Sequence, residues 1–206
     1  MRLLVASHNE HKIREIKELT AHLDLEVVGL SEAGDYPPVI EDGDTFQANA
    51  RKKAVEIANL SGQLVLADDS GLEVDVLEGA PGVHSARFAG EPASDQKNNA
   101  LLLEKLRDYP LEQRGAAFRC VMALAMPYGP VWLTEGVCRG VILYEPRGEG
   151  GFGYDPLFYV PEYEKTFAEL GAQVKNRISH RYLAMQEMLE VIERVKKPEK
   201  SSVNSL

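Results

Sequence analysis

The chain has 206 residues, enough for one α/β domain or two small lobes with a substantial buried core. Its formal net charge of −9 argues against a general nucleic-acid binder, which normally carries a basic face. The longest apolar run, Cys120 to Met126, is far too short to cross a bilayer, so we expect no membrane segment.

The first 20 residues predict a strand followed by a charged amphipathic segment, which differs from the pattern of a signal peptide. Cys120 and Cys138 lie in strand-like segments without the spacing of metal ligands, so reduced and buried thiols are the simplest interpretation. We therefore expect a cytoplasmic protein. The acidic charge does not exclude an anionic small ligand, because a few lysines, a helix N-terminus and a metal ion suffice to bind one.

Strands and helices alternate in the N-terminal part of the chain. Apolar runs predict strands over residues 3–6, 25–30, 63–67 and 73–77. A helix is predicted from about Asn9, and a second one from Asp44 or Thr45 to about Leu60. The segment 31–44 contains glycine, prolines and acids and is predicted to be a loop.

Consecutive strands are expected in the middle of the chain, over residues 118–126 and 131–143. Helices are predicted over residues 94–106 and 179–195, and a glycine-rich loop over residues 147–153. This order predicts an α/β fold with a mixed β-sheet, flanking helices and a cleft. We assign residues 1–195 to one domain and residues 196–206 to a polar C-terminal tail.

A short polar segment, Ser7-His8-Asn9-Glu10-His11-Lys12, joins the first strand to the first helix. The unpaired N–H groups at a helix N-terminus attract phosphate, and Lys12 adds a full positive charge. The segment is therefore a candidate phosphate site. A purely structural interpretation also fits, in which Asn9 caps the helix and Lys12 is solvated.

One lysine interrupts the apolar side of the second predicted helix. Phe46, Ala50 and Ile57 form an apolar stripe by helical periodicity, and Lys53 lies in the middle of it with Asn49 beside it. Lys53 either extends along the helix surface to reach water or faces a buried anion, for which a triphosphate is a candidate.

The strongest local feature is the segment Leu66-Ala67-Asp68-Asp69-Ser70-Gly71-Leu72. It predicts two adjacent carboxylates at the carboxyl end of a buried strand, followed by a sharp turn at Gly71, and ligands of open α/β sheets collect at such ends. Mg²⁺ commonly binds one or two carboxylates together with water and substrate phosphate oxygens. The alternative is a turn whose aspartates only cap backbone groups. Glu73 and Asp75 alternate with apolar residues and are interpreted as a solvated strand face.

Two later segments contain candidate contacts to a nucleotide base. Gly150-Gly151-Phe152-Gly153-Tyr154-Asp155-Pro156 combines a flexible backbone with aromatic rings that can stack on a base, although a hairpin loop with a packed Phe152 fits equally. Lys175 precedes Ser179-His180-Arg181, which opens the last predicted helix, and Arg181 can donate hydrogen bonds to a keto oxygen.

Taken together, these segments resemble the Ham1-like inosine/xanthosine triphosphate pyrophosphatase family. The similarity follows the family's order and extends from residue 2 to about 192. The matching segments are Ala6-Ser7-His8-Asn9 with Lys12, Thr45-Phe46 with Asn49-Ala50 and Lys53, Ala67 to Asp75, Gly79 to Arg87, Asp95 to Asn98, Gly151 to Pro156, Lys165 to Leu170, and Ser179 to Arg181. One departure is His8, which stands where the family usually has glycine.

The resemblance implies an elongated fold of two lobes around a central mixed sheet, with the substrate in the cleft between them, and a homodimer. It implies Mg²⁺-dependent hydrolysis of abnormal purine nucleoside triphosphates such as ITP, dITP and XTP to the monophosphate and pyrophosphate. Asp69 would be the proton acceptor and a Mg²⁺ ligand, Glu41 a second ligand and Ser70 a substrate contact. The phosphates would be held by Ser7, His8, Asn9, Glu10, His11, Lys12 and Lys53. The base pocket would consist of Phe152, Gly153, Tyr154, Asp155, Lys175, His180 and Arg181.

Two other functions remain open from the residues alone. The first is a pyrophosphatase of the Maf-like kind, which prefers pyrimidine or methylated nucleotides. The second is a nucleotide sensor without catalytic activity, against which the Asp68-Asp69 pair argues, because a phosphate binder gains little from concentrated negative charge. A hydrolase triad of Ser70, His180 and an aspartate is disfavoured, because no nucleophile-elbow pattern surrounds Ser70.

Overall fold

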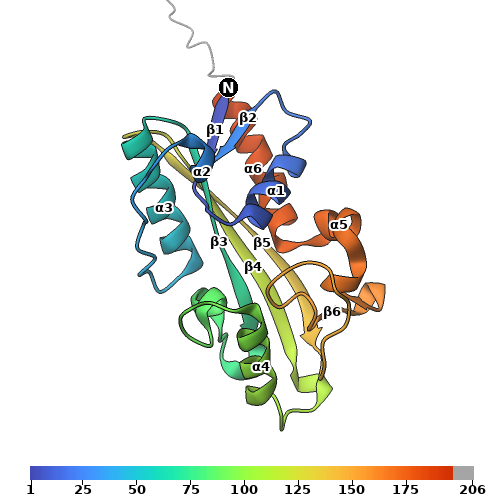
Figure 1. Ribbon diagram of the computed structural model, residues 1–206. Coiled ribbons are helices and arrows are strands. Elements are labelled where there is room, and N and C mark those ends of the chain that lie inside the picture. Colours follow the sequence, from blue (N-terminus) through green and yellow to red (C-terminus); the bar gives the residue numbers. More distant parts are fainter. Residues whose placement is uncertain (197–206) are drawn as a thin grey trace, which may run out of the picture.

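The computed structural model describes residues 1–196, and within them seven strands form one sheet. The order across the sheet is β2-β1-β3-β4-β5-β6-β7 (Figure 1). The strands are β1 Arg2–Val5, β2 Glu26–Gly29, β3 Val65–Val74, β4 Gly115–Ala125, β5 Val131–Ile142, β6 Phe158–Val160 and β7 Lys165–Thr166. The α-helices are α1 Glu10–Leu19, α2 Leu30–Ala33, α3 Phe46–Ser61, α4 Asp95–Lys105, α5 Phe167–Ile178 and α6 His180–Lys196.

The sheet is mixed and flanked by helices, as the sequence predicted. β1 runs parallel to both of its neighbours, β2 and β3, whereas each pairing from β3 to β7 is antiparallel. β1 pairs with β3 only at Leu4–Val65 and Val5–Leu66, while β3 continues along β4 to Val74. The second half of β3 is therefore bordered by loops and helix ends rather than by β1.

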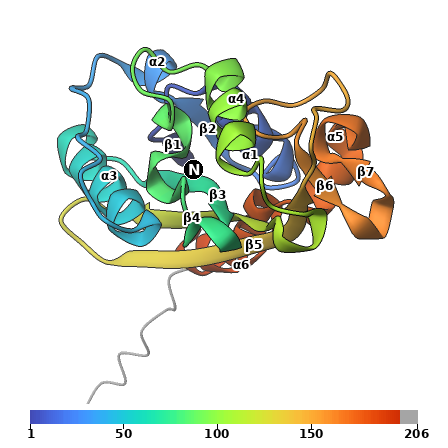
Figure 2. The same ribbon diagram turned by 90° about the horizontal axis from the view of Figure 1, so that it is seen from below.

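Helices cover both faces of the long strands. On one face, α1 and α6 pack against residues such as Leu66 and Met122, and on the other face α3 packs against Val65 and Ala123. Figure 2 shows α3 and α6 on opposite sides of β4 and β5. This arrangement follows from the alternation of side chains along a strand, which sends neighbouring residues to opposite faces of the sheet.

The helix α6 lies directly on β5 at Gly136. A Cβ atom at this position would lie 2.9 Å from the Cβ atom of Leu183 and still closer to backbone atoms of His180 and Ala184. The hydroxyl of Thr134 also donates a hydrogen bond to the carbonyl oxygen of Ala184 (2.8 Å). The missing side chain at Gly136 therefore permits a close approach that fixes the first turn of α6 against the sheet.

The prediction that one strand ends at residue 67 and another begins at residue 73 is wrong. Residues 65–74 form one continuous strand, because β4 pairs with all of it, from Val65–Ala125 to Val74–Ala116. Gly71 lies inside this strand, and a Cβ atom there would collide with the Gly82 carbonyl oxygen and the Ser85 hydroxyl. The glycine is thus needed for close packing and not for a turn. Residues 75–77 form a 3₁₀ turn in place of the predicted strand end.

Two further differences concern elements that the sequence did not indicate. The predicted loop 31–44 begins with the single helical turn α2, and the region 158–178 contains β6, β7 and α5. α5 is interrupted at Gly171, whose φ of 71° is not helical. The short β6 and β7 exist because they pair with β5 and with each other.

No helix among residues 1–196 is long and apolar enough to cross a membrane. The helix α6 includes Lys196, the first residue of the predicted C-terminal tail. The rest of that predicted tail, residues 197–206, lies outside the described residues. The assignment of residues 1–195 to one domain stays a prediction.

Candidate active site

A cavity of about 410 Å³ lies beside the second half of β3, and we call it the main cavity. It brings together most of the site residues predicted from the sequence. Those that line it are Asn9, Lys12, Glu41, Lys53, Asp69, Ser70, Phe152, Gly153, Tyr154, Asp155, Lys175, His180 and Arg181. A second cavity of about 300 Å³ shares Phe152 and Lys175 with it.

The N-terminus of α1 supplies Asn9 and Lys12 to the main cavity. The side-chain oxygen of Asn9 caps the helix by accepting the N–H groups of His11 (3.0 Å) and Lys12 (3.2 Å). The structural interpretation of Asn9 is thus correct, and the residue lines the cavity as well. Lys12 is not a solvated residue, because its ammonium group pairs with Asp68 at 3.0 Å.

Four members of the predicted phosphate segment lie elsewhere. Ser7, His8 and Glu10 line neither cavity, and His11 lines only the smaller one. The Ser7 hydroxyl accepts the N–H of Asn9 (3.1 Å), so it supports the turn into α1. Their predicted contacts with phosphate stay predictions.

α3 carries Lys53 on its buried side. Phe46, Ala50 and Ile57 are buried, as their periodicity predicted. The Lys53 side chain is only 12% exposed, and its ammonium group lies 2.8 Å from Glu41 Oε1 and donates to the carbonyl oxygen of Asp68 (3.1 Å). Lys53 therefore faces the cavity instead of extending to bulk water, and it holds the otherwise unremarkable loop acid Glu41 at the cavity wall.

The two adjacent aspartates of β3 point to opposite faces of the sheet. Asp69 faces α3, where its Oδ2 accepts a hydrogen bond from the Asn49 amide (3.1 Å) and its Oδ1 accepts the N–H of Ser70 (3.0 Å). Asp68 faces α1 and α6, where Lys12 and Arg181 approach it. Only Asp69 lines the main cavity, so the pair divides into one cavity acid and one buried acid.

Burial and charge act differently on these two carboxyl groups. For Asp69, burial raises the pKa above its usual value, and the nearby ammonium groups of Lys53 and Lys12 only partly oppose this shift. For Asp68, burial acts in the same direction, but the positive charges of Lys12, Arg181 and Lys53 outweigh it and hold the pKa well below its usual value. Asp68 is therefore ionised at neutral pH.

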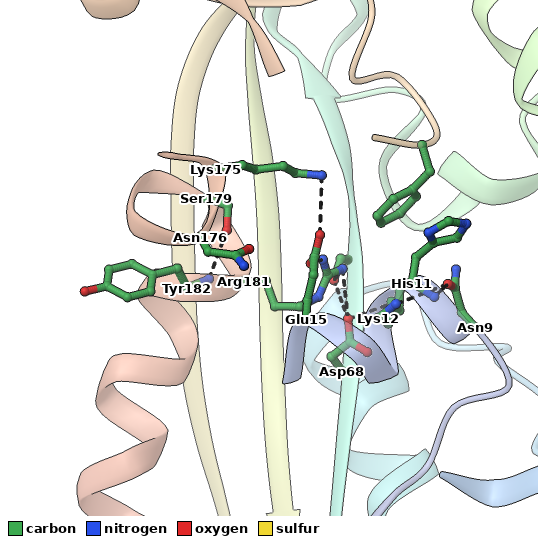
Figure 3. Close-up of polar contacts among 12 residues, drawn as sticks. Asn9, His11, Lys12, Glu15, Asp68, Lys175, Asn176, Ser179, Arg181 and Tyr182 are labelled. Atoms are coloured by element: carbon green, nitrogen blue, oxygen red, sulfur yellow. Dashed lines mark hydrogen bonds and ion pairs between the residues drawn. The ribbon is translucent and has the colours of Figure 1, made fainter. Parts of the chain in front are cut away.

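Positively and negatively charged side chains alternate in a series of ion pairs beside the main cavity, from Lys12 to Lys175 (Figure 3). Lys12 and Arg181 both pair with Asp68, at 3.0 and 3.4 Å. Glu15 of α1 pairs in turn with Arg181 and, at 3.4 Å, with Lys175. Because these groups are largely buried, their charges are screened little by water and constrain one another's positions.

Lys175 also connects this series to the glycine-rich loop. Its ammonium group lies 2.6 Å from Asp155 Oδ2, which accepts the N–H of Phe152 as well (2.9 Å). Gly151 and Gly153 have positive φ angles of 75° and 61° on either side of Phe152. The loop is thus held in a conformation that presents the Phe152 ring between the two cavities.

Aromatic contacts complete this part of the site. His11 stacks on the ring of Phe152 with centroids 5.1 Å apart, and the Lys175 ammonium lies 4.6 Å from the centroid of that ring. His180 stacks on Phe118 at 4.9 Å. Burial lowers the pKa of His180 well below the usual histidine value, and the charges of Arg181 and Lys175 act in the same direction, so its imidazole is neutral at pH 7.

The sequence analysis missed Glu15 and gave Asn49 no role in the site, and it treated Asp68 and Asp69 as one pair although only Asp69 lines the main cavity. Glu15 follows Lys12 by three positions on α1, so the two lie on the same side of the helix. Asn49 precedes Lys53 by four positions on α3 and lies on the same side for the same reason. Helical spacing from a suspected lysine is thus the signal that could have identified both residues.

A divalent cation fits the carboxylates of the main cavity. The described residues contain no group of three or more histidine, cysteine, aspartate or glutamate side chains arranged as a metal site. Glu41 and Asp69 nevertheless both line the cavity, and Mg²⁺ often takes only one or two carboxylates and completes its shell with water and substrate phosphate oxygens. The donors therefore suit a hard cation that is held partly by a triphosphate.

Three lysines, the buried Arg181 and four carboxylates line the main cavity of this α/β fold, and this arrangement is that of an enzyme acting on a polyanionic substrate. The chain belongs to the Ham1 family, whose family model matches residues 3–191. The resemblance stated from the sequence is thereby confirmed.

Relatives of known name cover nearly the whole chain. It is 54% identical over 195 residues to the dITP/XTP pyrophosphatase of Desulforamulus reducens, a match that covers 95% of this chain and 97% of that protein. The dITP/XTP pyrophosphatase of Geobacter sulfurreducens is 52% identical, with 89% of this chain and 92% of the relative covered.

Solved structures of the family show the same fold. The Ham1 protein of Staphylococcus aureus is 40% identical and superposes with a TM-score of 0.85, covering 94% of this chain and 98% of that one. The HAM1 protein of Coxiella burnetii is also 40% identical, with a TM-score of 0.86 over 94% and 99% of the two chains.

Proposed function

We propose that this chain hydrolyses ITP, dITP and XTP to the nucleoside monophosphate and pyrophosphate, with Mg²⁺ as its cofactor. The observation that carries the proposal is the convergence of Lys12, Lys53, Glu41 and Asp69 on a cavity that also holds the Phe152 ring. The name dITP/XTP pyrophosphatase, carried by relatives 54% and 52% identical to the chain, supports the substrate class.

The chemistry follows from how the charged groups surround the cavity. A water oxygen attacks the α-phosphorus while the bond from this phosphorus to the bridging oxygen breaks, and pyrophosphate leaves. Lys12 and Lys53 neutralise the phosphate oxygens during this displacement. Asp69 accepts the proton of the attacking water, a role that suits a carboxylate whose pKa is raised by burial. When bound, Mg²⁺ would polarise the phosphate oxygens and lower the charge on the leaving group.

Base recognition would rest on Phe152 and the buried donors near it. The ring offers a face on which a purine stacks, and the glycines beside it allow the backbone to approach closely. ITP and XTP have a keto oxygen at the six-position, which accepts hydrogen bonds from Lys175 or Arg181, whereas ATP has an amino group there. A mismatch between two buried donors leaves both unpaired and can cost a factor of roughly 10⁴ in selectivity.

A panel of nucleoside triphosphates tests the proposal. We expect pyrophosphate, and not inorganic phosphate, to be released from ITP, dITP and XTP in the presence of Mg²⁺, and the release to stop when EDTA is added. The panel includes ATP, dUTP, UTP and methylated GTP, with separate detection of the two products. Preference for a pyrimidine or methylated nucleotide would establish a Maf-like specificity instead. Binding of ITP without any product would establish a sensor.

The cellular role follows from this activity. By removing abnormal purine triphosphates, the enzyme would cleanse the nucleotide pool and prevent their incorporation into DNA and RNA. The homodimer and the cytoplasmic location stay predictions from the resemblance and the composition.

A further inference from the structure

Asp68 is a buried acid that the proposed chemistry does not use. It lies in the middle of β3, its side chain has no exposed surface, and it points away from Asp69 toward α1 and α6. Isolating a carboxylate from water in this way is costly unless cations and hydrogen-bond donors compensate. The buried negative charge of Asp68 therefore needs a functional or structural explanation.

The contacts of Asp68 join two parts of the site at a single atom. Its Oδ2 lies 3.0 Å from the ammonium group of Lys12, which comes from the first turn of α1. The same oxygen lies 3.4 Å from Nη2 of Arg181, which comes from the first turn of α6, and it accepts a hydrogen bond from the Ser70 hydroxyl at 2.7 Å. One carboxylate oxygen thus holds a phosphate-binding cation and a base-binding cation together.

The two cations differ in how strongly they depend on Asp68. Arg181 also pairs with Glu15. Lys12 forms no other ion pair within residues 1–196. Without the negative charge of Asp68, Lys12 and Arg181 would repel each other, and Lys12 would lose its only ion pair among the described residues.

We infer that Asp68 is a positioning residue that fixes Lys12 and Arg181 relative to each other, so that the triphosphate and the base of one substrate are bound at a set separation. The inference rests on the proposed function, because it takes Lys12 to meet phosphate and Arg181 to meet the base. It predicts that one substitution, at a residue that does not itself line the main cavity, weakens the recognition of both ends of the substrate.

The test is Asp68→Asn in the full-length protein, which keeps the shape of the side chain and removes its charge. The inhibition constant of inorganic tripolyphosphate, measured against ITP hydrolysis with Mg²⁺ in excess, reports the phosphate end. The ratio of kcat/KM for ITP to that for ATP reports the base end. We expect Asp68→Asn to weaken tripolyphosphate inhibition and to narrow the ITP-to-ATP ratio by about tenfold each, the scale of one charge-assisted hydrogen bond.

Matched variants separate this effect from a general disturbance of the strand. Glu73→Gln removes an acid from the same strand that pairs with Arg119 and does not line the main cavity, and we expect both readouts to stay within twofold of wild type, or about 0.4 kcal/mol. Lys12→Met should change mainly the inhibition constant, and Arg181→Met mainly the nucleotide ratio.

Three results would overturn the inference. The first is a folded Asp68→Asn protein in which only one readout changes, or neither. The second is a wild-type enzyme that tripolyphosphate does not inhibit. If Asp68→Asn does not fold, a double-mutant cycle of Lys12→Met and Arg181→Met replaces it. The third contradicting result is then that the effects of these two substitutions on kcat/KM for ITP are additive. Failure of the proposed function is distinguishable, because wild-type protein would then release no pyrophosphate from ITP.

Discussion

The replacement of Asp69 by asparagine separates catalysis from folding in this protein. The Asp69 carboxylate accepts one hydrogen bond at each oxygen, from the Asn49 amide (3.1 Å) and from the Ser70 N–H (3.0 Å). An asparagine can satisfy one of these donors with its carbonyl oxygen, and its amide group then faces the other. The substitution therefore removes one hydrogen bond and the negative charge while leaving the shape of the side chain unchanged.

Asp69→Asn should affect the free energy of unfolding less than it affects the activation barrier for turnover. One lost hydrogen bond with a buried donor costs about 1–3 kcal/mol in the free energy of unfolding. Part of this cost is offset, because the raised pKa of Asp69 shows that folding disfavours the ionised carboxylate, and the neutral amide avoids that penalty. Removing the proton acceptor lowers turnover about 10²- to 10⁴-fold, which corresponds to about 2.7–5.5 kcal/mol in the barrier.

The assay compares pyrophosphate release from ITP with unfolding in urea for the same preparations. We expect Asp69→Asn to lose at least 99% of turnover, the lower of these bounds, with a change of at most about 3 kcal/mol in the free energy of unfolding. Glu73→Gln on the same strand serves as the control. An Asp69→Asn enzyme that keeps turnover within threefold of wild type would refute the assignment of Asp69 as proton acceptor.

Three further predictions address the base pocket, the buried histidine and the packing of α6. Arg181→Ala should narrow the preference in kcat/KM for ITP over ATP, and an unchanged preference would mean that another group contacts the keto oxygen. Because burial keeps His180 neutral in the folded protein, the unfolded state binds more protons below about pH 6.5, so His180 should lower the free energy of unfolding by about 1.4 kcal/mol per pH unit as the pH falls. Urea unfolding of His180→Gln should lack this part of the slope, and equal slopes would contradict the assignment of a neutral imidazole. Gly136→Ala should destabilise the fold by about 1–3 kcal/mol, because its methyl group would press α6 away from β5. The measurement is thermal unfolding, and an unchanged midpoint temperature would contradict the close contact between α6 and β5.

Features that depend on neighbouring residues were predicted well from the sequence. Asn9 and Thr45 cap α1 and α3, because each side chain reaches N–H groups no more than three positions along the chain. The place of Lys53 within an apolar stripe follows from helical periodicity alone. These features brought the sequence analysis close to the main cavity.

The interpretation of the Asp68-Asp69 pair needed the tertiary structure. The pattern after residue 67 is typical of a turn, yet β4 pairs with the segment and keeps it extended to Val74. As a result, the two carboxylates lie inside a strand and face opposite sides of the sheet, one in the cavity and the other buried against Lys12 and Arg181. The acids were correctly marked as important, but their separate environments could not be predicted.

The sequence by itself indicated the mixed α/β fold and the caps of α1 and α3, because caps and periodicity act over a few positions of the chain. Most of the residues around the cavity were named through the resemblance to the family. Only the tertiary structure decided which charges meet. Arg181 lies 113 positions from Asp68 and 166 from Glu15, and it reaches both because Gly136 lets α6 pack closely on β5. Contacts of this kind depend on where whole elements settle against one another, and no local pattern encodes that.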